Sequence, residues 1–494
     1  MIRRAPQGVI KMSSSGVAAK PRAQAAASAR TSLILKRGFP IAMAITIWNL
    51  PVPAGLTPQS WHLFAIFSTA IVSVLLSVYT LLTSTMLAAG AVVLTKTLSA
   101  EKAFAGFANS SVLLVVVAFL VAQAVVKSGL GQRIALFMVS LFGRSSLGLA
   151  YSVVLTDAAI APAFPSNTAR GGVLFPIVLS VAQGSGSNPD DPKGRRLGGY
   201  LMFCAMAGLA VSSALWMTAT SANPIAIQVA AKYGVKVDFG SWLIASSLPA
   251  LICILALPWL VARLFSPGVG STPDAPAAAR KALGEMGSLS REEWLTAIAF
   301  ALMVTGWILA DKIHLSVTSI AFAGLGLLLM SGVLTAHDIA TQGDTLATFL
   351  WLAVLFALST QLNELGFMGY VGQRLAAYMG GLSWPVTYVA LTLLYVAIHY
   401  MFVSQSSQVL ALLGVFLDVG IRGGVPASLM AFSLFFASSY FSVITPQGGS
   451  QNIIFVGSGY LTQRELYKLG LLTTVFFLTV FLTVGTGWLM LVAR

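Results

Sequence analysis

Long apolar segments separated by short polar joints recur along almost the whole chain. They lie near residues 39–53, 61–78, 80–97, 111–128, 147–164, 169–183, 197–217, 240–264, 294–310, 315–334, 346–362, 384–402, 407–420, 427–443 and 468–492. Only 9% of all residues are charged and 57% are hydrophobic, which is too little charge to cover the surfaces of soluble domains. A spanning helix needs about 20 apolar residues, so the length allows on the order of ten crossings. The sequence therefore predicts an all-α polytopic membrane protein, with the lipid bilayer as its surroundings.

Positive charge is concentrated in two segments. The net charge is +14, and residues 1–37 contain basic but no acidic side chains. A second basic group is formed by Arg263, Arg280, Lys281 and Arg291. Basic loops stay on the cytoplasmic side of a membrane. The excess of positive charge is therefore explained by membrane orientation and does not indicate nucleic acid as a partner. The predicted division is a basic disordered tail at 1–38, a first transmembrane repeat at 39–264, a cytoplasmic loop at 265–293 and a second transmembrane repeat at 294–494.

The N-terminal segment leaves two cellular locations open. Residues 1–32 are rich in Arg, Ser and Ala and lack acidic residues, which fits a cytoplasmic tail and also fits an organellar transit peptide. The first alternative places the protein in a bacterial inner membrane. The second places it in a plastid inner envelope after cleavage of the transit peptide.

The two halves of the chain share matches in the same order. Residues 131–135 read GQRIA and residues 372–376 read GQRLA. Each match precedes a pair of apolar segments with a polar interruption, at 162–168 in the first half and at 404–408 in the second. Further on, the segment Trp216–Pro224 parallels Ile444–Asn452. Three ordered matches predict an internal repeat, and an odd number of spans in each half would invert the two halves in the membrane.

The densest polar cluster runs from Asp157 to Gly172. Pro162 and Pro165 remove backbone donors and break the helix. A helix that begins after this break directs free N–H groups and the positive end of its dipole at an anion, for which a carboxylate is the natural choice. Hydroxyl and carbonyl oxygens at the same break can bind Na⁺. Interrupted segments at matching positions in two halves therefore predict a transporter binding site.

Signatures of enzymes are missing from the sequence. It contains four histidines but no H-E-x-x-H, Cys-x-x-Cys, G-x-S-x-G or phosphate-loop pattern. We therefore expect no enzyme activity, no ATP-driven pumping and no cofactor, which leaves secondary transport.

Three stretches resemble the divalent anion/sodium symporter family: PSNTARGG at 165–172, SQSS at 404–407, and TPQGG with NIIFVGSGYL at 445–461. They are most similar to the branch of di- and tricarboxylate exchangers, which includes plastid 2-oxoglutarate/malate translocators and bacterial citrate or tartrate/succinate antiporters. The resemblance implies two inverted repeats, each with a re-entrant helical hairpin and an unwound helix. It also implies an elevator-type transporter whose transport domain moves against a homodimeric scaffold.

The resemblance implies secondary active transport of small C4–C6 carboxylates such as malate, succinate, 2-oxoglutarate, tartrate or citrate, by exchange. Na⁺-coupled symport is the alternative, and an anion channel is a more remote one. Similar exchangers often carry a histidine where this chain has Gln408. Arg170 is therefore the one cation expected within the hairpin motif, and it either contacts a substrate carboxylate or pairs with Asp157.

The predicted substrate-binding residues come from both breaks and from the segments that follow them. They are Ser166, Asn167, Thr168, Arg170, Ser404, Gln405, Ser406, Gln408, Thr220 and Thr445. A coupling Na⁺ would lie near Ser166, Asn167, Asn223, Ser404 and Asn452. We expect Thr218, Asn223 and Asn452 to line the same cavity.

Other polar side chains within apolar segments are predicted to be structural. His399 is expected to be a packing residue, and Asp418 and Arg422 are expected to face an interface or each other. Arg133 and Arg374 are expected to reach lipid headgroups.

Overall fold

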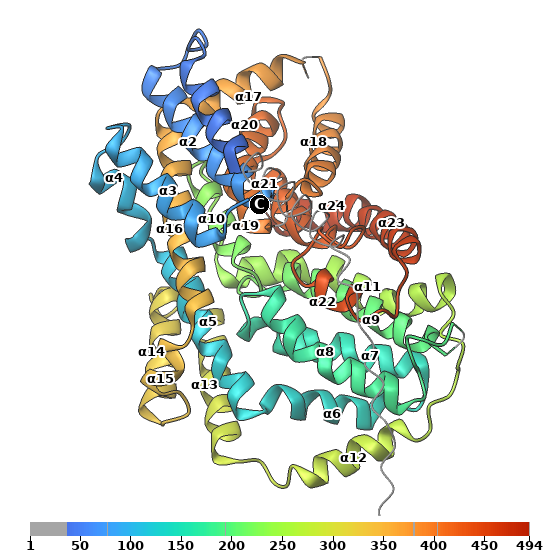
Figure 1. The fold of residues 1–494 in the computed structure, drawn as a ribbon. Coiled ribbons are helices and arrows are strands. Elements are labelled where there is room, and N and C mark those ends of the chain that lie inside the picture. Colours follow the sequence, from blue (N-terminus) through green and yellow to red (C-terminus); the bar gives the residue numbers. More distant parts are fainter. Residues whose placement is uncertain (1–36, 77, 193, 379–380, 403, 494) are drawn as a thin grey trace, which may run out of the picture.

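The computed structural model describes residues 37–76, 78–192, 194–378, 381–402 and 404–493. Within these ranges every regular element is a helix (Figure 1). The tail predicted at 1–38 lies almost entirely outside the described residues, so its disorder and the transit-peptide alternative stay predictions.

The helices follow a similar order in the two halves. The first half contains α2 (Pro58–Leu75), α3 (Leu81–Leu94), α4 (Ala100–Phe104), η1 (Ala105–Ala108), α5 (Ser110–Ser128), α6 (Leu130–Phe142), α7 (Ser146–Ile160), η2 (Ala161–Ala163), α8 (Asn167–Gly184), α9 (Arg196–Leu215), α10 (Ala222–Ala231) and α11 (Phe239–Leu264). The second contains α13 (Arg291–Leu309), α14 (Val317–Met330), α15 (Ala336–Ala340), α16 (Gly343–Glu364), α17 (Phe367–Tyr378), α18 (Trp384–His399), α19 (Gln405–Gln408), η3 (Val409–Leu413), α20 (Gly414–Arg422), α21 (Ala427–Tyr440), α22 (Asn452–Val456), α23 (Gln463–Val480), η4 (Phe481–Gly485) and α24 (Thr486–Val492). In each half a helix pair with a break is followed by a long helix and then by a shorter helix.

Eight of the described helical segments are long and apolar enough to cross a membrane. They are Pro58–Leu75, Ser110–Ser128, Ser146–Ala163, Arg196–Leu215, Phe239–Leu264, Arg291–Leu309, Gly343–Glu364 and Gln463–Val492. Many large apolar side chains on their outer surfaces are exposed, for example Leu251, Trp259 and Leu302. Such a surface is stable only against lipid, so the prediction of an all-helical polytopic membrane protein is confirmed.

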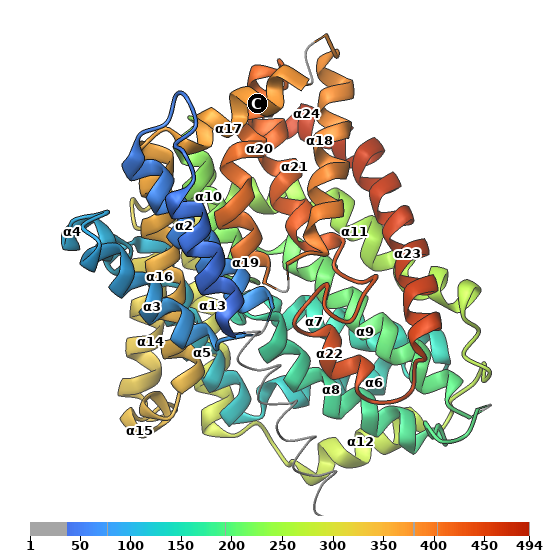
Figure 2. The same ribbon diagram turned by 45° about the horizontal axis from the view of Figure 1, so that its top comes forward.

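The first hairpin and its neighbours pack on one side of the molecule, and the second hairpin packs on the other. Figures 1 and 2 both show α6–α9 grouped together, α17, α18, α20 and α21 grouped together, and α19 between the two groups. Helices α3, α5, α14 and α16 form a third group along the edge, in which α5 contacts α14 and α16, and α16 contacts α3. The breaks of both hairpins therefore meet in the interior.

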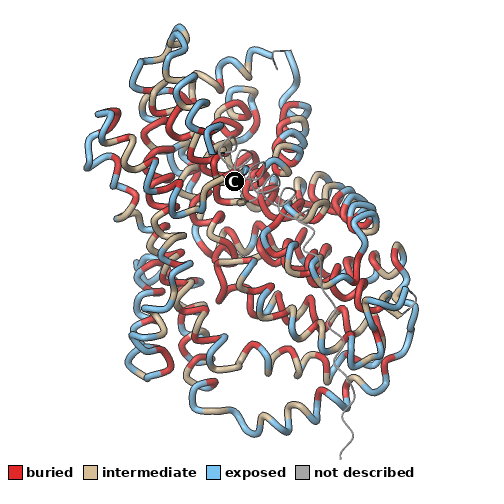
Figure 3. The backbone as a smooth tube through the Cα atoms, viewed as in Figure 1, coloured by how far each residue is buried: buried red, intermediate tan, exposed pale blue. Residues whose placement is uncertain are grey.

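Helix α9 forms the centre of the first group. Every residue from Leu197 to Ala214 in it is buried, and Figure 3 shows the buried residues gathered in the interior of the bundle. Small residues permit this close approach. A Cβ on Gly208 would lie 3.2 Å from Val154, and a Cβ on Gly198 would lie 2.2 Å from the ring of Tyr460.

The segment between the two halves was predicted to be a loop, but it contains a helix, α12 (Ala275–Glu285). It contacts α6. The expectation that Arg133 reaches lipid headgroups is wrong, because its Nε lies 2.6 Å from Glu293 Oε1 and its Nη1 donates to the Gly287 carbonyl at 2.9 Å. The side of the membrane on which residues 265–293 lie stays a prediction.

Candidate functional site

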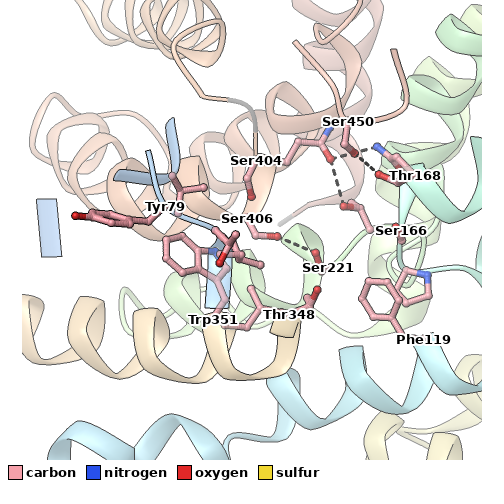
Figure 4. Close-up of a pocket in the computed structure, with 18 of the residues that line it drawn as sticks. Tyr79, Phe119, Ser166, Thr168, Ser221, Thr348, Trp351, Ser404, Ser406 and Ser450 are labelled. Carbon is pink, nitrogen blue, oxygen red and sulfur yellow. Dashed lines mark hydrogen bonds between the residues drawn. The ribbon is translucent and has the colours of Figure 1, made fainter. Parts of the chain in front are cut away.

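A cavity of about 640 Å³ lies where the breaks of the two halves meet (Figure 4). One side is formed by Pro165, Ser166, Asn167, Thr168, Thr220, Ser221, Ser404, Gln405, Ser406 and Ser450. The other side is formed by Val74, Val78, Tyr79, Thr80, Leu81, Phe119, Thr348, Trp351 and Leu352. Its volume is that of a small-molecule site. The first side is rich in hydroxyl and amide groups, and the second is mainly apolar.

Each break ends in a serine that caps the next helix. Ser166 Oγ accepts a hydrogen bond from the Ala169 N–H at 3.3 Å, and Ser404 Oγ accepts one from the Ser407 N–H at 3.3 Å. Helix α8 and the continuous helical run α19–η3–α20 therefore both begin at the cavity. Their N-terminal N–H groups and positive dipole ends favour an anion there.

The two hairpin tips touch each other. Asn167 Nδ2 donates to Gln405 Oε1 at 3.2 Å, and Thr220 Oγ1 donates to the same oxygen at 3.3 Å. Asn167 and Gln405 occupy matching positions in the two halves. Contact between equivalent residues is expected where a two-fold axis passes between two halves.

Two further contacts are exchanged between the halves. Thr168 Oγ1 lies 2.7 Å from Ser450 Oγ, and Ser406 Oγ lies 2.8 Å from Ser221 Oγ. Thr168 matches Ser406, and Ser221 matches Ser450. Each hairpin therefore bonds to the unwound segment of the other half, which is the reciprocity that a two-fold relation produces.

We expect the two residues that form each of these contacts to be energetically coupled. In a double-mutant cycle, Ser221→Ala and Ser406→Ala should show a coupling of about 0.5–1.5 kcal/mol in the free energy of unfolding, the net value of a hydrogen bond. Unfolding by SDS in mixed micelles measures it. The exposed pair Ser316 and Ser319, whose hydroxyls lie 2.7 Å apart, is the control and should show a coupling near zero. Equal coupling in the two pairs would contradict the expectation.

Asn223 and Asn452 stabilise the unwound segments instead of lining the cavity. Asn223 Nδ2 donates to the carbonyls of Ser213 and Trp216, at 2.8 and 3.1 Å. Asn452 Nδ2 donates to the carbonyls of Ser442 and Thr445, at 2.6 and 2.9 Å. The same arrangement occurs in both halves and satisfies carbonyls that the unwound backbone leaves free.

Part of the predicted cavity lining is therefore wrong. Thr220 lines the cavity, but Thr218, Asn223, Thr445 and Asn452 do not. Thr218 Oγ1 donates to the Pro162 carbonyl at 2.9 Å and stabilises the backbone at the break of the first half. A role for Asn223 and Asn452 near a coupling Na⁺ stays a prediction.

Arg170 is buried in an ion pair behind the first tip. Its Nη1 lies 3.2 Å from both carboxylate oxygens of Asp157 and donates to Ser212 Oγ at 2.6 Å. Its Nη2 donates to Asn167 Oδ1 at 2.7 Å, and Asn167 lines the cavity. Of the two predicted alternatives, the structure contains the pair with Asp157. Arg170 reaches the cavity only through Asn167.

Gln408 matches Arg170 in position and is buried in the same way behind the second tip. Its Nε2 donates to the Tyr395 carbonyl at 3.0 Å, and its Oε1 lies 2.5 Å from His399 Nδ1. The other ring nitrogen of His399 lies 2.7 Å from the Gly448 carbonyl. His399 is thus a hydrogen-bonded packing residue, as predicted. Arg170 and Gln408 are both absent from the cavity wall, whose described residues carry no charged side chain.

Asp418 and Arg422 face each other, which is one of the two predicted arrangements. Arg422 Nε lies 2.7 Å from Asp418 Oδ2, one turn apart on α20. This pair lies outside the cavity wall. Arg374, for which lipid headgroups were the expected partner, lies over the Tyr370 ring at 5.3 Å.

Several cavity residues are not predicted from the sequence. Ser221 and Ser450 lie within the matched segments, so the repeat contained a signal for them. Tyr79, Phe119 and Trp351 lie in ordinary apolar segments, where nothing distinguishes them from core residues.

The comparison with known families decides the class of the protein. The sequence profile of the sodium:sulfate symporter transmembrane region matches residues 31–494. The chain belongs to this family. The predicted resemblance to the divalent anion/sodium symporters is thereby confirmed, and this symporter-family protein is a membrane transporter, not an enzyme.

Its relatives include named carboxylate transporters. The chain is 35% identical over 460 residues to dicarboxylate transporter 2, chloroplastic, of Spinacia oleracea. The aligned region covers 91% of this chain and 82% of that protein. It is 29% identical over 469 residues to the citrate/succinate antiporter of Escherichia coli (strain K12), with 90% and 96% covered.

Two solved transporters share the fold. The Alcanivorax borkumensis YdaH transporter has a TM-score of 0.53 at 17% identity, covering 79% of this chain and 88% of the other. Neisseria gonorrhoeae MtrF has a TM-score of 0.55 at 16% identity, covering 93% and 94%. At these identities the likeness concerns the fold alone.

Proposed function

We propose that this protein is a secondary active transporter of C4–C6 di- and tricarboxylates that works by exchange and uses no cofactor. The observation that carries the proposal is the cavity at which two helical runs of opposite halves begin, with hydroxyl and amide groups around it. Such a site binds carboxylates through helix N-termini. Relatives named as dicarboxylate transporter and citrate/succinate antiporter support the substrate class.

The charge balance of the cavity supports exchange. Each helix N-terminus contributes about half an elementary charge, so two contribute about +1. The charge of Arg170 is offset by Asp157, 3.2 Å away. A bound dicarboxylate dianion therefore keeps about one uncompensated negative charge. When one dianion leaves for each that enters, this charge moves equally in both directions and no coupling ion is needed.

One observation favours Na⁺-coupled symport as the second candidate. Thr445 Oγ1, Gln451 Oε1 and Asn452 Oδ1 are buried and have no hydrogen-bond partner among the described residues. Uncharged oxygens of this kind are suitable ligands for a hard cation. A Na⁺ held there, or near Ser166, Asn167, Asn223, Ser404 and Asn452 as first predicted, would supply the missing positive charge.

We further propose an elevator mechanism with inverted repeats. The reciprocal bonds Thr168–Ser450 and Ser406–Ser221 support the two-fold relation that inverted repeats require. The cavity lies between the hairpin tips and the group containing α3, α5 and α16, so sliding one group past the other would carry the substrate across. A homodimer would hold the group containing α3, α5 and α16 in place. We place the protein in a bacterial inner membrane, with a plastid inner envelope as the alternative.

Counterflow in proteoliposomes tests the function. Uptake of labelled succinate should saturate, should require unlabelled dicarboxylate inside and should not require Na⁺. Competition by unlabelled malate, 2-oxoglutarate, tartrate and citrate identifies the preferred substrate. Na⁺-dependent uptake into empty vesicles would select symport. Non-saturating flux without stimulation from the trans side would instead indicate an anion channel.

A further inference from the structure

The indole of Trp351 is an unpaired donor at the cavity wall. Trp351 is 2% exposed and belongs to the side of the cavity formed by α16. Its Nε1 has no hydrogen-bond partner among the described residues. Figure 4 shows its ring beside Ser406, on the opposite side of the cavity from Ser166 and Thr168. A buried N–H without an acceptor destabilises the structure that contains it.

Other tryptophans of the same chain are paired. Trp242 and Trp307 are the two other tryptophans among the largest fully buried side chains, and they donate to the carbonyls of Ala214 and Val317, each at 3.0 Å. The more exposed indoles of Trp61, Trp216 and Trp488 also donate to carbonyls, at 2.8, 2.9 and 2.8 Å. Buried indoles normally find an acceptor. Trp351 differs from them in its position at the cavity.

The surroundings of Trp351 offer few other donors to a ligand. Val74, Val78, Leu81, Phe119 and Leu352 are apolar. The Tyr79 hydroxyl donates to the Arg37 carbonyl at 3.3 Å, and Thr80 Oγ1 lies 2.9 Å from Thr83 Oγ1. Thr348 lies one turn before Trp351 on the same face of α16. Among the described residues of this side, the Trp351 N–H and the Thr348 hydroxyl are therefore the side-chain donors left for a ligand.

We propose that Trp351 binds the second carboxylate of the substrate through its Nε1–H and thereby sets the preference for dicarboxylates over monocarboxylates. This inference rests on the proposed carboxylate transport. The hairpin tips and their helix N-termini hold the first carboxylate, and a four-carbon chain directs the second toward α16. A monocarboxylate leaves the Trp351 donor unpaired, and a site with an unpaired buried polar group discriminates strongly against such a ligand.

Trp351→Phe tests this inference, because it keeps an aromatic ring and removes the N–H. Succinate and butyrate are the probes, since they share a four-carbon chain and differ by one carboxylate. In proteoliposomes the KM for succinate should rise about tenfold or more, as expected for loss of a hydrogen bond to a charged group. The inhibition constant of butyrate should stay within about twofold, so the ratio of the succinate KM to the butyrate inhibition constant rises.

Trp307→Phe is the matched control, because it removes a paired indole on α13, outside the cavity wall. It should lower thermal stability and leave the ratio of the succinate KM to the butyrate inhibition constant unchanged. Trp351→Phe should lower the stability of the ligand-free protein less than Trp307→Phe does, since it leaves no carbonyl without its donor. Trp351→His, which keeps a ring N–H, should restore part of the preference.

Several outcomes would overturn the assignment. One is a ratio of the succinate KM to the butyrate inhibition constant that is unchanged in Trp351→Phe. If both constants rise equally, the effect of Trp351 is packing alone. If the Phe variant does not purify as a monodisperse protein, Trp351→Leu replaces it with the same expectation. Failure of the wild type to transport any carboxylate would refute the proposed function itself. Succinate transport with an unchanged ratio in the variant would refute only the role of Trp351.

Discussion

Arg170→Ala is expected to abolish transport and to lower the free energy of unfolding by about 3–5 kcal/mol, the usual effect of removing one partner from a buried ion pair. The substitution leaves the Asp157 carboxylate buried without its guanidinium and removes one of the two donors to Asn167 Oδ1, the other being Ser213 Oγ. Unfolding in mixed micelles and succinate counterflow measure the two effects. Wild-type stability in this variant would contradict the ion pair.

A charge-neutral double variant separates the contribution of Arg170 to stability from its contribution to transport. Asp157→Asn with Arg170→Gln resembles the uncharged arrangement at the matching position of the second half, where Gln408 is hydrogen-bonded to His399 and the Tyr395 carbonyl. We expect it to recover most of the lost stability and a measurable part of transport. Recovered stability without transport would show that the charge itself acts on the substrate. Arg170→Lys should be partly active, since lysine keeps the charge but lacks the planar fork.

Gln405→Glu is expected to reduce carboxylate uptake at neutral pH at least a hundredfold. Gln405 Oε1 accepts bonds from Asn167 and Thr220, and a glutamate of the same shape keeps both. The new negative charge would lie at the anion site. Two like charges about 4 Å apart repel by about 4 kcal/mol at an effective dielectric constant of 20. Counterflow of labelled succinate measures the loss.

Gln405→Leu is the control for this charge effect, because it removes the hydrogen bonds without adding a charge. Its uptake should lie between that of the wild type and that of Gln405→Glu. Thermal unfolding should show that the glutamate variant remains folded. Uptake equal to wild type in Gln405→Glu would show that the second hairpin tip is not part of the anion site.

The positions of the hairpin breaks follow from local sequence. The first helical run continues through Pro162 to Ala163, and Pro165 lies in the break that follows. Ser166 and Ser404 cap the helices that begin after the two breaks. The hydrophobic segments predicted the membrane class, because lipid-facing helices need apolar surfaces of a minimum length. The ordered matches between the halves predicted equivalent breaks, and the structure brings Asn167 of one into contact with Gln405 of the other.

The partners of the remaining polar side chains depended on tertiary packing. From the sequence, Arg170 had two alternatives, and Gln408, Thr445, Asn223 and Asn452 were expected at the site. The structure instead places Asp157 and Ser212 against the face of α8 that carries Arg170, and it turns both asparagines toward backbone carbonyls. Local sequence determines where a helix starts, because caps and prolines act within one turn. Which side of that helix faces a cavity depends on the distant segments that pack against it, and the sequence around the break contains no information about them.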